Sequence, residues 1–282
     1  MPASGSSSVQ AARHVLADRL REMCKDAGLD GKGLAQACGW HPSKVSRIST
    51  AKTSPSVDDI RAWCQACGRE DQTDDLIASL RAVEGMFVDW RRMERAGLRQ
   101  AQEARLPLYE RTRRFRSYSP GLVPGLIQTY GYTEDVLRAV QRRRVEIDDV
   151  ADAVAARMER QHVLYEGHRR FAFLIEESVL RNAFGAADAQ LEQLEHLLAV
   201  ASLPNVSLGV VPMGLGRARM PVEGFWIFDK AQVNVELVSG YLTLTQPSEV
   251  GAYADTFAAL AEEAVYGAKA RALIAAVMDS LG

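Results

Sequence analysis

The chain has 282 residues, of which 47% are apolar and 25% charged, and its formal net charge at pH 7 is −2. This composition is typical of a globular protein, and the length exceeds the size at which one hydrophobic core usually stops growing, so we expect two domains. There is no long uncharged apolar run and no secretion signal, so we expect a cytoplasmic protein with no membrane partner.

Charge is distributed unevenly along the chain. Residues 28–56 carry a local charge of +3, from Lys32, Lys44, Arg47 and Lys52 against Asp30. Because nucleic-acid binding depends on the local electrostatic field, the acidic overall charge does not exclude a DNA partner.

The amino-terminal part predicts a series of helices. Residues 1–10, rich in Ser, Gly and Ala, are expected to form a disordered tail. From about residue 11, apolar side chains recur every three to four positions, which predicts a helix that ends at Gly28. A short helix is expected over 31–38, and Pro42 suits the first turn of another that runs to residue 49.

Two further helices complete a predicted bundle of five, which spans residues 11–82. Ser56 and Asp59 predict a capping-box-like start to a helix that continues to Cys67. The last short helix is expected over residues 74–83. Five helices in so short a stretch indicate one compact domain.

The segment after the bundle is expected to connect two domains. Residues 83–106 predict a helical connector, and most of them belong to a dense basic run over residues 84–116. We interpret this run as a solvated helical face whose arginines have carboxylate partners. The alternative is an auxiliary surface that contacts phosphates.

Residues 107–282 predict a larger regulatory or dimerisation domain. Amphipathic patterns predict helices at about 130–143, 147–166, 187–202, 248–265 and 268–280. Runs rich in β-branched and aromatic residues predict strands at 171–176, 206–212, 224–229 and 233–237. The expected fold is therefore mainly α, with an amino-terminal five-helix bundle followed by a larger α+β (mixed α/β) domain.

Residues 34–49, LAQACGWHPSKVSRIS, have the spacing of a helix-turn-helix. This motif needs small and apolar residues where its two helices pack together, and a turn residue that tolerates a positive φ. The residues that meet these requirements are Leu34, Ala35, Gly39, Val45 and Ile48.

The outward face of the second motif helix is polar, as a face that enters a major groove must be. Lys44 and Arg47 are expected to contact bases or phosphates, because Lys and Arg can reach guanine O6 and N7. Ser43 is expected to contact a base. The residues expected to position the DNA backbone are Lys32, Ser46 and Lys52.

The motif and its surroundings resemble the Xre family of Cro/repressor-like regulators. The run LAQACGWHPSKVSRISTAKTSPS is similar to the family pattern LA...G.....VSRIE.G...PS, within a resemblance that covers roughly residues 11–82. It implies a repressor-like helix-turn-helix domain. The chain departs from the pattern where Ser49 replaces Glu, where Ala51 replaces Gly, and where Gly31 or Lys32 replaces a frequent Gln.

The remainder resembles the C-terminal domain of WhiJ-like regulators of actinomycetes. Matching stretches include FRSYSPGLVPGLIQTYGYTEDVLRA, FAFLIEESVLRNAFG and LPNVSLGVVP, in the family's order within residues 107–282. The resemblance implies a regulatory domain without an established chemistry. It also implies a small acidic partner protein in an antitoxin-like or developmental-control arrangement.

Other side chains were weighed as ligands or catalysts. The four cysteines are interpreted as core thiols rather than a zinc site, because two are three residues apart in one predicted helix; they are Cys24, Cys38, Cys64 and Cys67. Trp40 is expected to pack the turn and His41 to cap the following helix, with DNA contact as the alternative. The Gly-rich loop 212–221 lacks a P-loop ending, so a lid or edge of a small-molecule pocket is a more plausible role for it than nucleotide binding.

No arrangement of acidic, histidine or serine residues has the spacing of a catalytic or metal site, so we expect no enzyme, metal or cofactor. The sequence predicts a sequence-specific DNA-binding transcriptional regulator. Its C-terminal domain is expected to form a homodimer, to sense a small-molecule effector or partner protein, or both. The alternative is a protein-interaction module, antitoxin-like, with weak or vestigial DNA binding.

Overall fold

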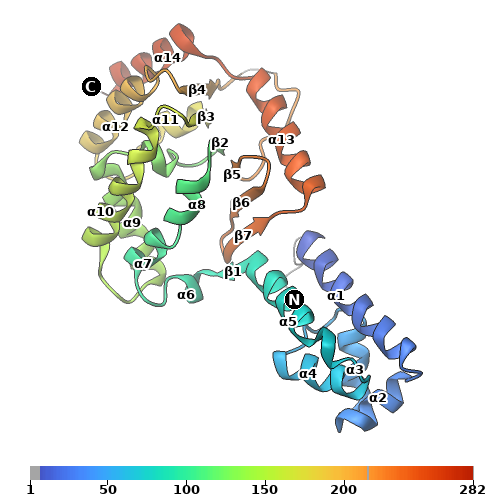
Figure 1. Cartoon of the computed structure of the whole chain (residues 1–282). Helices are drawn as coiled ribbons and strands as arrows, with labels where there is room; N and C mark the ends of the chain where they lie inside the picture. The colour runs from blue at the N-terminus through green and yellow to red at the C-terminus, as the bar shows by residue number, and fades with distance from the viewer. Residues whose placement is uncertain (1–6, 215, 282) are drawn as a thin grey trace. The chain divides into compact units, whose positions relative to one another are not determined.

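The computed structural model describes residues 7–214 and 216–281, and it divides after Val88 into two units with separate hydrophobic cores (Figure 1). The first is a bundle of helices. The second combines a mixed sheet with helices. The predicted fold class, a helical bundle followed by an α+β domain, is therefore confirmed. The expected domain boundaries stay a prediction.

The described residues of the first unit, from residue 7 onward, form five α-helices, as expected. They are α1 (Ser7–Asp26), α2 (Gly31–Cys38), α3 (Pro42–Ser49), α4 (Val57–Ala66) and α5 (Thr73–Met86). A single 3-10 turn, Glu70–Gln72, precedes α5. The predicted capping box is present, because the Ser56 hydroxyl accepts from the Asp59 amide and the Asp59 carboxylate accepts from the Ser56 amide.

Helix α1 begins earlier than the sequence predicts. Residues 7–10 form its first turns, although we expected them in a disordered tail; residues 1–6 lie outside the described part of the chain. The side chain of Gln10 donates to the carbonyl of Ala51, 3.5 Å away. This tertiary contact gives the start of the helix a partner that composition alone does not reveal.

Trp63 is the largest side chain in the core of the first unit and is only 1% exposed. Its indole N–H donates to the Leu20 carbonyl over 3.1 Å, so its one polar atom is satisfied. Cys24 and Cys67 pack beside it with their Sγ atoms 3.8 Å apart, and Cys64 is also buried. Burial raises the pKa of these thiols, as expected for core cysteines.

The sheet has the strand order β1-β7-β6-β5-β2-β3-β4. Its strands are β1 (Phe87–Asp89), β2 (Arg114–Ser119), β3 (Arg170–Glu176), β4 (Val206–Val211), β5 (Phe225–Phe228), β6 (Gln232–Glu236) and β7 (Gly240–Leu244). Strands β2, β3 and β4 are parallel, whereas β5, β6 and β7 run antiparallel to their neighbours. The four predicted strands correspond to β3, β4, β5 and β6.

Strand β2 was missed although it is central, pairing with β3 on one side and β5 on the other. Its sequence, RFRSYS, was interpreted as part of a solvated basic run. Alternate residues explain the error: Phe115 and Ser117 are buried on one face of the strand, while Arg114 is exposed. A strand of this kind carries arginine and core residues within six positions.

The helices of the second unit are α6 (Trp90–Met93), α7 (Leu98–Glu103), α8 (Leu106–Arg111), α9 (Tyr130–Arg144), α10 (Val150–Arg160), α11 (Glu177–Arg181), α12 (Ala187–Val200), α13 (Pro247–Glu262) and α14 (Gly267–Leu281). The helix expected over 147–166 is shorter, because α10 ends at Arg160 and a 3-10 turn follows. Helix α7, expected in a connector, packs against α10 inside this unit.

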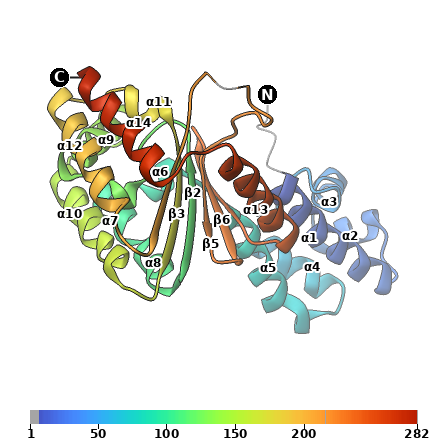
Figure 2. The same cartoon turned by 90° about the horizontal axis from the view of Figure 1, so that it is seen from above.

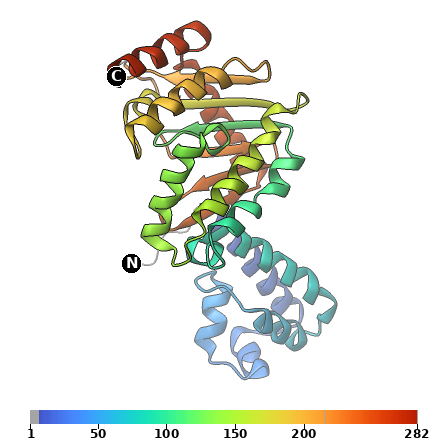
Figure 3. The same ribbon diagram turned by 90° about the vertical axis from the view of Figure 1, so that its left-hand side faces the viewer.

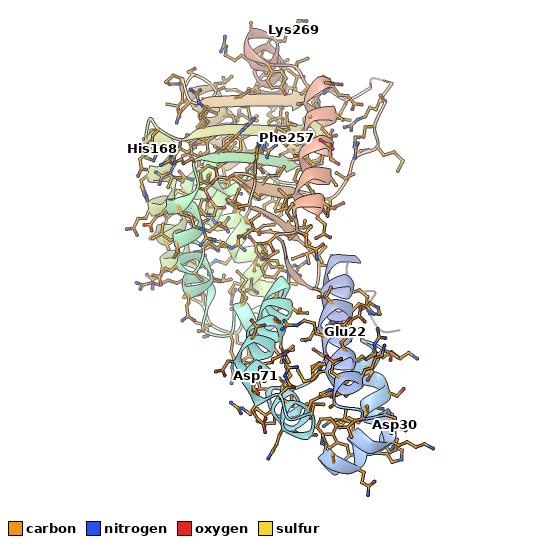
Figure 4. All side chains as sticks on the ribbon, turned by 45° about the vertical axis from the view of Figure 1, so that its right-hand side comes forward. Glu22, Asp30, Asp71, His168, Phe257 and Lys269 are labelled. Atoms are coloured by element: carbon orange, nitrogen blue, oxygen red, sulfur yellow. The ribbon has the colours of Figure 1, made fainter. Side chains whose placement is uncertain are left out.

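Helices cover both faces of the sheet (Figure 2). Helix α13 lies on one face, where Phe257, labelled in Figure 4, is buried and Tyr253 packs edge-on against Phe225. The other helices lie on the opposite face, and Figure 3 looks onto this layer with α9 and α10 in front of the strands. Phe115 and Phe171 stack on this face with ring centroids 4.7 Å apart. No helix among the described residues is long and apolar enough to span a membrane.

Candidate nucleic-acid interface

The interface is built on α2, a tight turn and α3. Asp30, labelled in Figure 4, precedes α2, and its carboxylate accepts hydrogen bonds from the Lys32 and Gly33 amides. Gly39 ends the helix in the left-handed conformation with φ 66°, which glycine adopts without steric cost. The Trp40 amide then donates to the Ala35 carbonyl over 2.8 Å, so the chain reverses tightly into α3.

The apolar framework of the motif is buried, as predicted. Leu34 and Ala35 on α2 and Val45 and Ile48 on α3 are each at most 3% exposed and lie in one cluster. Burial of these four residues fixes the rotation of α3 about its own axis. The remaining side of α3 therefore faces solvent.

The amino-terminus of α3 is open to solvent. His41 caps it as expected, with Nδ1 accepting from the Ser43 amide over 3.3 Å, and Pro42 occupies the first turn. His41, Pro42 and Ser43 are all exposed. The partial positive charge at a helix amino-terminus favours a phosphate at such a position.

Lys44 is not a free cation, because its ammonium group is paired within the bundle. Its ammonium lies 2.5 Å from the carboxylate of Asp59 on α4 and 4.3 Å from the centre of the Trp40 ring. The side chain is 38% exposed. Burial acts to raise the pKa of Asp59, but hydrogen bonds from Lys44 and Ser56 outweigh it and lower that pKa. Asp59 thus neutralises much of the charge that Lys44 would offer a ligand.

Arg47 and its neighbours form the most open part of the face. Arg47, Ser43 and Ser46 are exposed. Within the described part of the chain, the guanidinium of Arg47 has no hydrogen bond or ion pair, so its donors face solvent. We call Ser43, Ser46 and Arg47 the α3 face. It offers a cationic fork and two hydroxyls at helical spacing.

The two peripheral lysines are exposed at the ends of the motif. Lys32 lies in the first turn of α2 and Lys52 in the loop after α3, where its amide donates to the Arg47 carbonyl. Ala51 in that loop has φ 54°, in the region that favours glycine. Ala51 is one of the three positions where the sequence departs from the Xre pattern, and its backbone still adopts the conformation that a glycine would suit.

Two contacts of α3 were not predicted. Arg21 on α1 donates to the Ser49 carbonyl over 3.4 Å, and Asp59, expected only as a capping residue, also binds Lys44. Each joins residues 28 or 15 positions apart on different helices. Local spacing holds no signal for such pairs, because they depend on how the helices pack.

The other candidate residues have structural partners. Trp40 packs against Trp63, with ring centroids 6.2 Å apart, as expected for a turn residue that contacts the bundle. In the loop 212–221, Arg217 donates to Glu176 and Glu263, with its Nη2 2.9 Å from Glu176 Oε1. These bonds tie the loop to the end of β3 and to the end of α13.

The chain matches two known domain families, one in each unit. Residues 15–77 match the model described as "Helix-turn-helix domain", and residues 105–276 match "Domain of unknown function (DUF5753)". The second match covers more than half of the chain. The chain belongs to the DUF5753 family. In this DUF5753 protein the first unit carries the helix-turn-helix domain, which supports a DNA-binding regulator; kinship with the Xre family or with WhiJ stays a prediction.

Distant likenesses are found among solved structures. The solved structure "Structure of TrmBL2, an archaeal chromatin protein, shows a novel mode of DNA binding" is 11% identical, with 89% of this chain and 100% of that chain covered and a TM-score of 0.33. No curated protein matches the DUF5753 chain.

Proposed function

We propose that this protein is a sequence-specific, DNA-binding transcriptional regulator. In this proposal α3 enters the major groove and the α3 face contacts bases and phosphates. The observation that supports it is the open guanidinium of Arg47 on a helix whose opposite side is buried in a helix-turn-helix framework.

The six candidate contact residues have graded roles in this proposal. Arg47 is the main contact with bases or phosphate, and Ser43 contacts a base. Ser46, Lys32 and Lys52 position the DNA backbone. Lys44 contributes less than Arg47, because its ammonium would first have to leave Asp59.

A single small helical module binds DNA weakly, so we further propose that two chains act together. Twofold-related copies would place two α3 helices about 34 Å apart, one turn of the duplex. The second unit would supply dimerisation, the sensing of an effector or partner protein, or both.

The test uses purified full-length protein and a site selected from genomic DNA with that protein. We expect Arg47→Ala to weaken binding by about 10-fold or more in fluorescence anisotropy, since one good base contact is worth about 1–3 kcal/mol. Arg19→Gln is the matched control. Arg19 on α1 is paired with Asp75 on α5, and its substitution also removes one positive charge. Equal affinities for both variants would reject the assignment.

The neutralised Lys44 favours a second candidate function, a protein-interaction module with vestigial DNA binding. Pairing with Asp59 removes one cation from the surface that would meet phosphate. The dependence of binding on salt concentration distinguishes the two functions. Binding through phosphates weakens steeply as salt rises because counterions are released, whereas binding to a protein through an apolar surface does not.

A further inference from the structure

The second unit contains a cavity of about 450 Å³ that none of the functions above uses. It lies between the helices α7 to α10 and the strands β5 and β6, and every residue that lines it belongs to the second unit. Its volume is within the range of small-molecule sites in proteins, roughly 300–1,000 Å³. The helical layer that covers it is the one seen in Figure 3.

Arginines dominate the charge of the cavity wall. The charged residues that line it are Arg105, Arg143, Arg157 and Arg160 against Glu94 and Glu236. Arg105 pairs with Glu236 over 3.1 Å and its guanidinium lies 4.9 Å from the centre of the Tyr241 ring. The wall therefore carries an excess of two positive charges in a chain that is acidic overall.

Arg157 and Arg160 bind amide oxygens in place of carboxylates. Arg157 donates to the side-chain oxygens of Gln102 and Gln128 over 3.1 and 2.9 Å, and Arg160 donates to the backbone carbonyl of Gln102 over 3.0 Å. Neither forms an ion pair with any described residue. One buried cation, Arg160, and one half-buried cation, Arg157, are thus held in position without a carboxylate partner in the described part of the chain. Removing a charge from water in this way is costly unless a negative charge is supplied.

Two arginine Nε donors without a hydrogen-bond partner among the described residues also favour the binding of an anion. Arg160 is only 3% exposed, and its buried Nε has no partner among the described atoms; the same is true of the Nε of Arg105. A buried donor without a partner costs about 1–3 kcal/mol. Burial, together with the neighbouring Arg160 and Arg105, lowers the pKa of Arg157 to about 9. An anion between these side chains would satisfy the donors and restore the usual preference for the charged form.

The remaining wall is apolar and partly aromatic. Trp226 of β5 and Tyr109 of α8 line it, and the Tyr109 ring lies 4.7 Å from the guanidinium carbon of Arg160. Leu98, Leu137 and Val140 come from α7 and α9. An inorganic ion would leave this part of the surface unoccupied. A molecule with an apolar body and one acidic group would use both parts.

We propose that the cavity is a binding site for a small organic anion, with its carboxylate held by Arg105, Arg157 and Arg160 and its apolar part against Trp226 and Tyr109. This inference rests on the sensing role proposed above for the second unit and names its ligand class. The three arginines come from α10 and from the residue before α8, so an anion would join segments that are about fifty residues apart in the chain.

The first test compares two ligands of nearly the same shape, one charged and one neutral, in their binding to the wild-type full-length protein. 4-Phenylbutyrate and its neutral amide, 4-phenylbutyramide, differ by one charge, and isothermal titration calorimetry measures the affinity of each. We expect the carboxylate to bind at least 10-fold more tightly, since a charge-assisted bond to arginine is worth roughly 1.5–3 kcal/mol. Equal affinities overturn the proposal. So does the absence of binding throughout a series from benzoate to 8-phenyloctanoate at millimolar concentration.

The second test places the binding in the cavity. Arg160→Gln and Arg157→Gln are each expected to weaken 4-phenylbutyrate binding at least 10-fold. Arg170→Gln is the control, because Arg170 is exposed on β3 and does not line this cavity. Unchanged affinity in both cavity variants overturns the proposal.

Folding of the variants is checked by circular dichroism. If Arg160→Gln and Arg157→Gln unfold, Arg143→Gln serves in their place, because Arg143 lines the cavity from an exposed position; we expect a loss of about threefold, and no loss overturns the site. Anisotropy with DNA in the absence of the carboxylate tests the DNA-binding function by itself. A protein that binds DNA but no carboxylate refutes only the anion site, and one that binds the carboxylate but no DNA refutes only the regulator.

Discussion

Arg47 in the first unit and Arg160 in the second carry the same guanidinium group in opposite settings. Arg47 is exposed on a short helix, whereas Arg160 is buried, bound to Gln102 and stacked on Tyr109. An exposed cation can meet a phosphate anywhere along a duplex, but solvent and salt screen it. A buried cation is screened much less and accepts only an anion that fits the space beside it. Position in the fold, more than residue type, therefore decides which anion an arginine can bind.

Truncation of the main core side chain of the first unit should affect that unit and leave the second one intact. Trp63→Ala removes the main core side chain of the first unit and its bond to Leu20, so we expect that unit to lose about 3–5 kcal/mol of unfolding free energy. DNA binding should fall with it, while 4-phenylbutyrate binding should persist because the second unit has its own core. Denaturation followed by circular dichroism and calorimetry measures both. Loss of carboxylate binding would show that the two units depend on each other.

A substitution on β4 tests the packing of the second unit. In Gly209→Ala the added methyl on β4 would lie 2.7 Å from Leu174 Cδ2 and from Tyr266 Cε1, so we expect overpacking to cost about 1–3 kcal/mol. Gly251→Ala is the control, since a Cβ there meets no atom within 4 Å. Urea denaturation measures the loss. Equal stability of the two variants would contradict the close packing of β4.

A smaller effect is expected in the turn of the helix-turn-helix. Gly39→Ala places a methyl group on a residue with φ 66°, which costs about 1 kcal/mol even though the surrounding space is open. Gly85→Ala in α5 is the control and should be neutral or stabilising, because its Cβ is also unobstructed but its φ is not positive. Thermal unfolding of the first unit measures both. A neutral Gly39→Ala would show that the turn adapts.

The smallest effect concerns Lys44. Asp59→Asn keeps an acceptor for the capping box but removes the negative charge opposite Lys44, so we expect a loss of about 0.5 kcal/mol in stability and a severalfold gain in DNA affinity. The contribution of the charge is present at neutral pH. It is lost as pH falls below the ordinary value of 3.8 through the lowered pKa of Asp59, so the stability difference between wild type and variant should vanish there. Urea denaturation across pH checks this, and a difference that persists in acid would contradict it.

Much of the first unit was predictable from local pattern. The bounds of α2 and α3, the left-handed Gly39 and the buried positions on both helices follow from apolar periodicity and from the conformational limits of glycine and proline. Each of these rules acts within one or two helical turns. The pairing of Lys44 with Asp59 was not predictable, because it depends on the packing of α3 against α4.

The second unit was harder to predict for the same reason. Strands with apolar runs were identified, whereas β2 was hidden within a basic segment, and Arg105 was interpreted as part of a solvated face. Arg105 and Arg160 are 55 positions apart, and nothing in the local pattern of either marks it as a cavity residue. Only the sheet and the helices above it bring them together.

By itself the sequence determined the class of fold, the helix-turn-helix framework and the exposed polar side of α3, because amphipathic periodicity states which side of a helix is buried. Packing between elements that are distant in the sequence sets which cations remain open to a partner. Asp59 neutralises Lys44 from another helix, and the packing of α10 over the sheet removes Arg160 from water without giving it a carboxylate. The free energy of a charge depends on every group around it, and those groups come from distant parts of the chain.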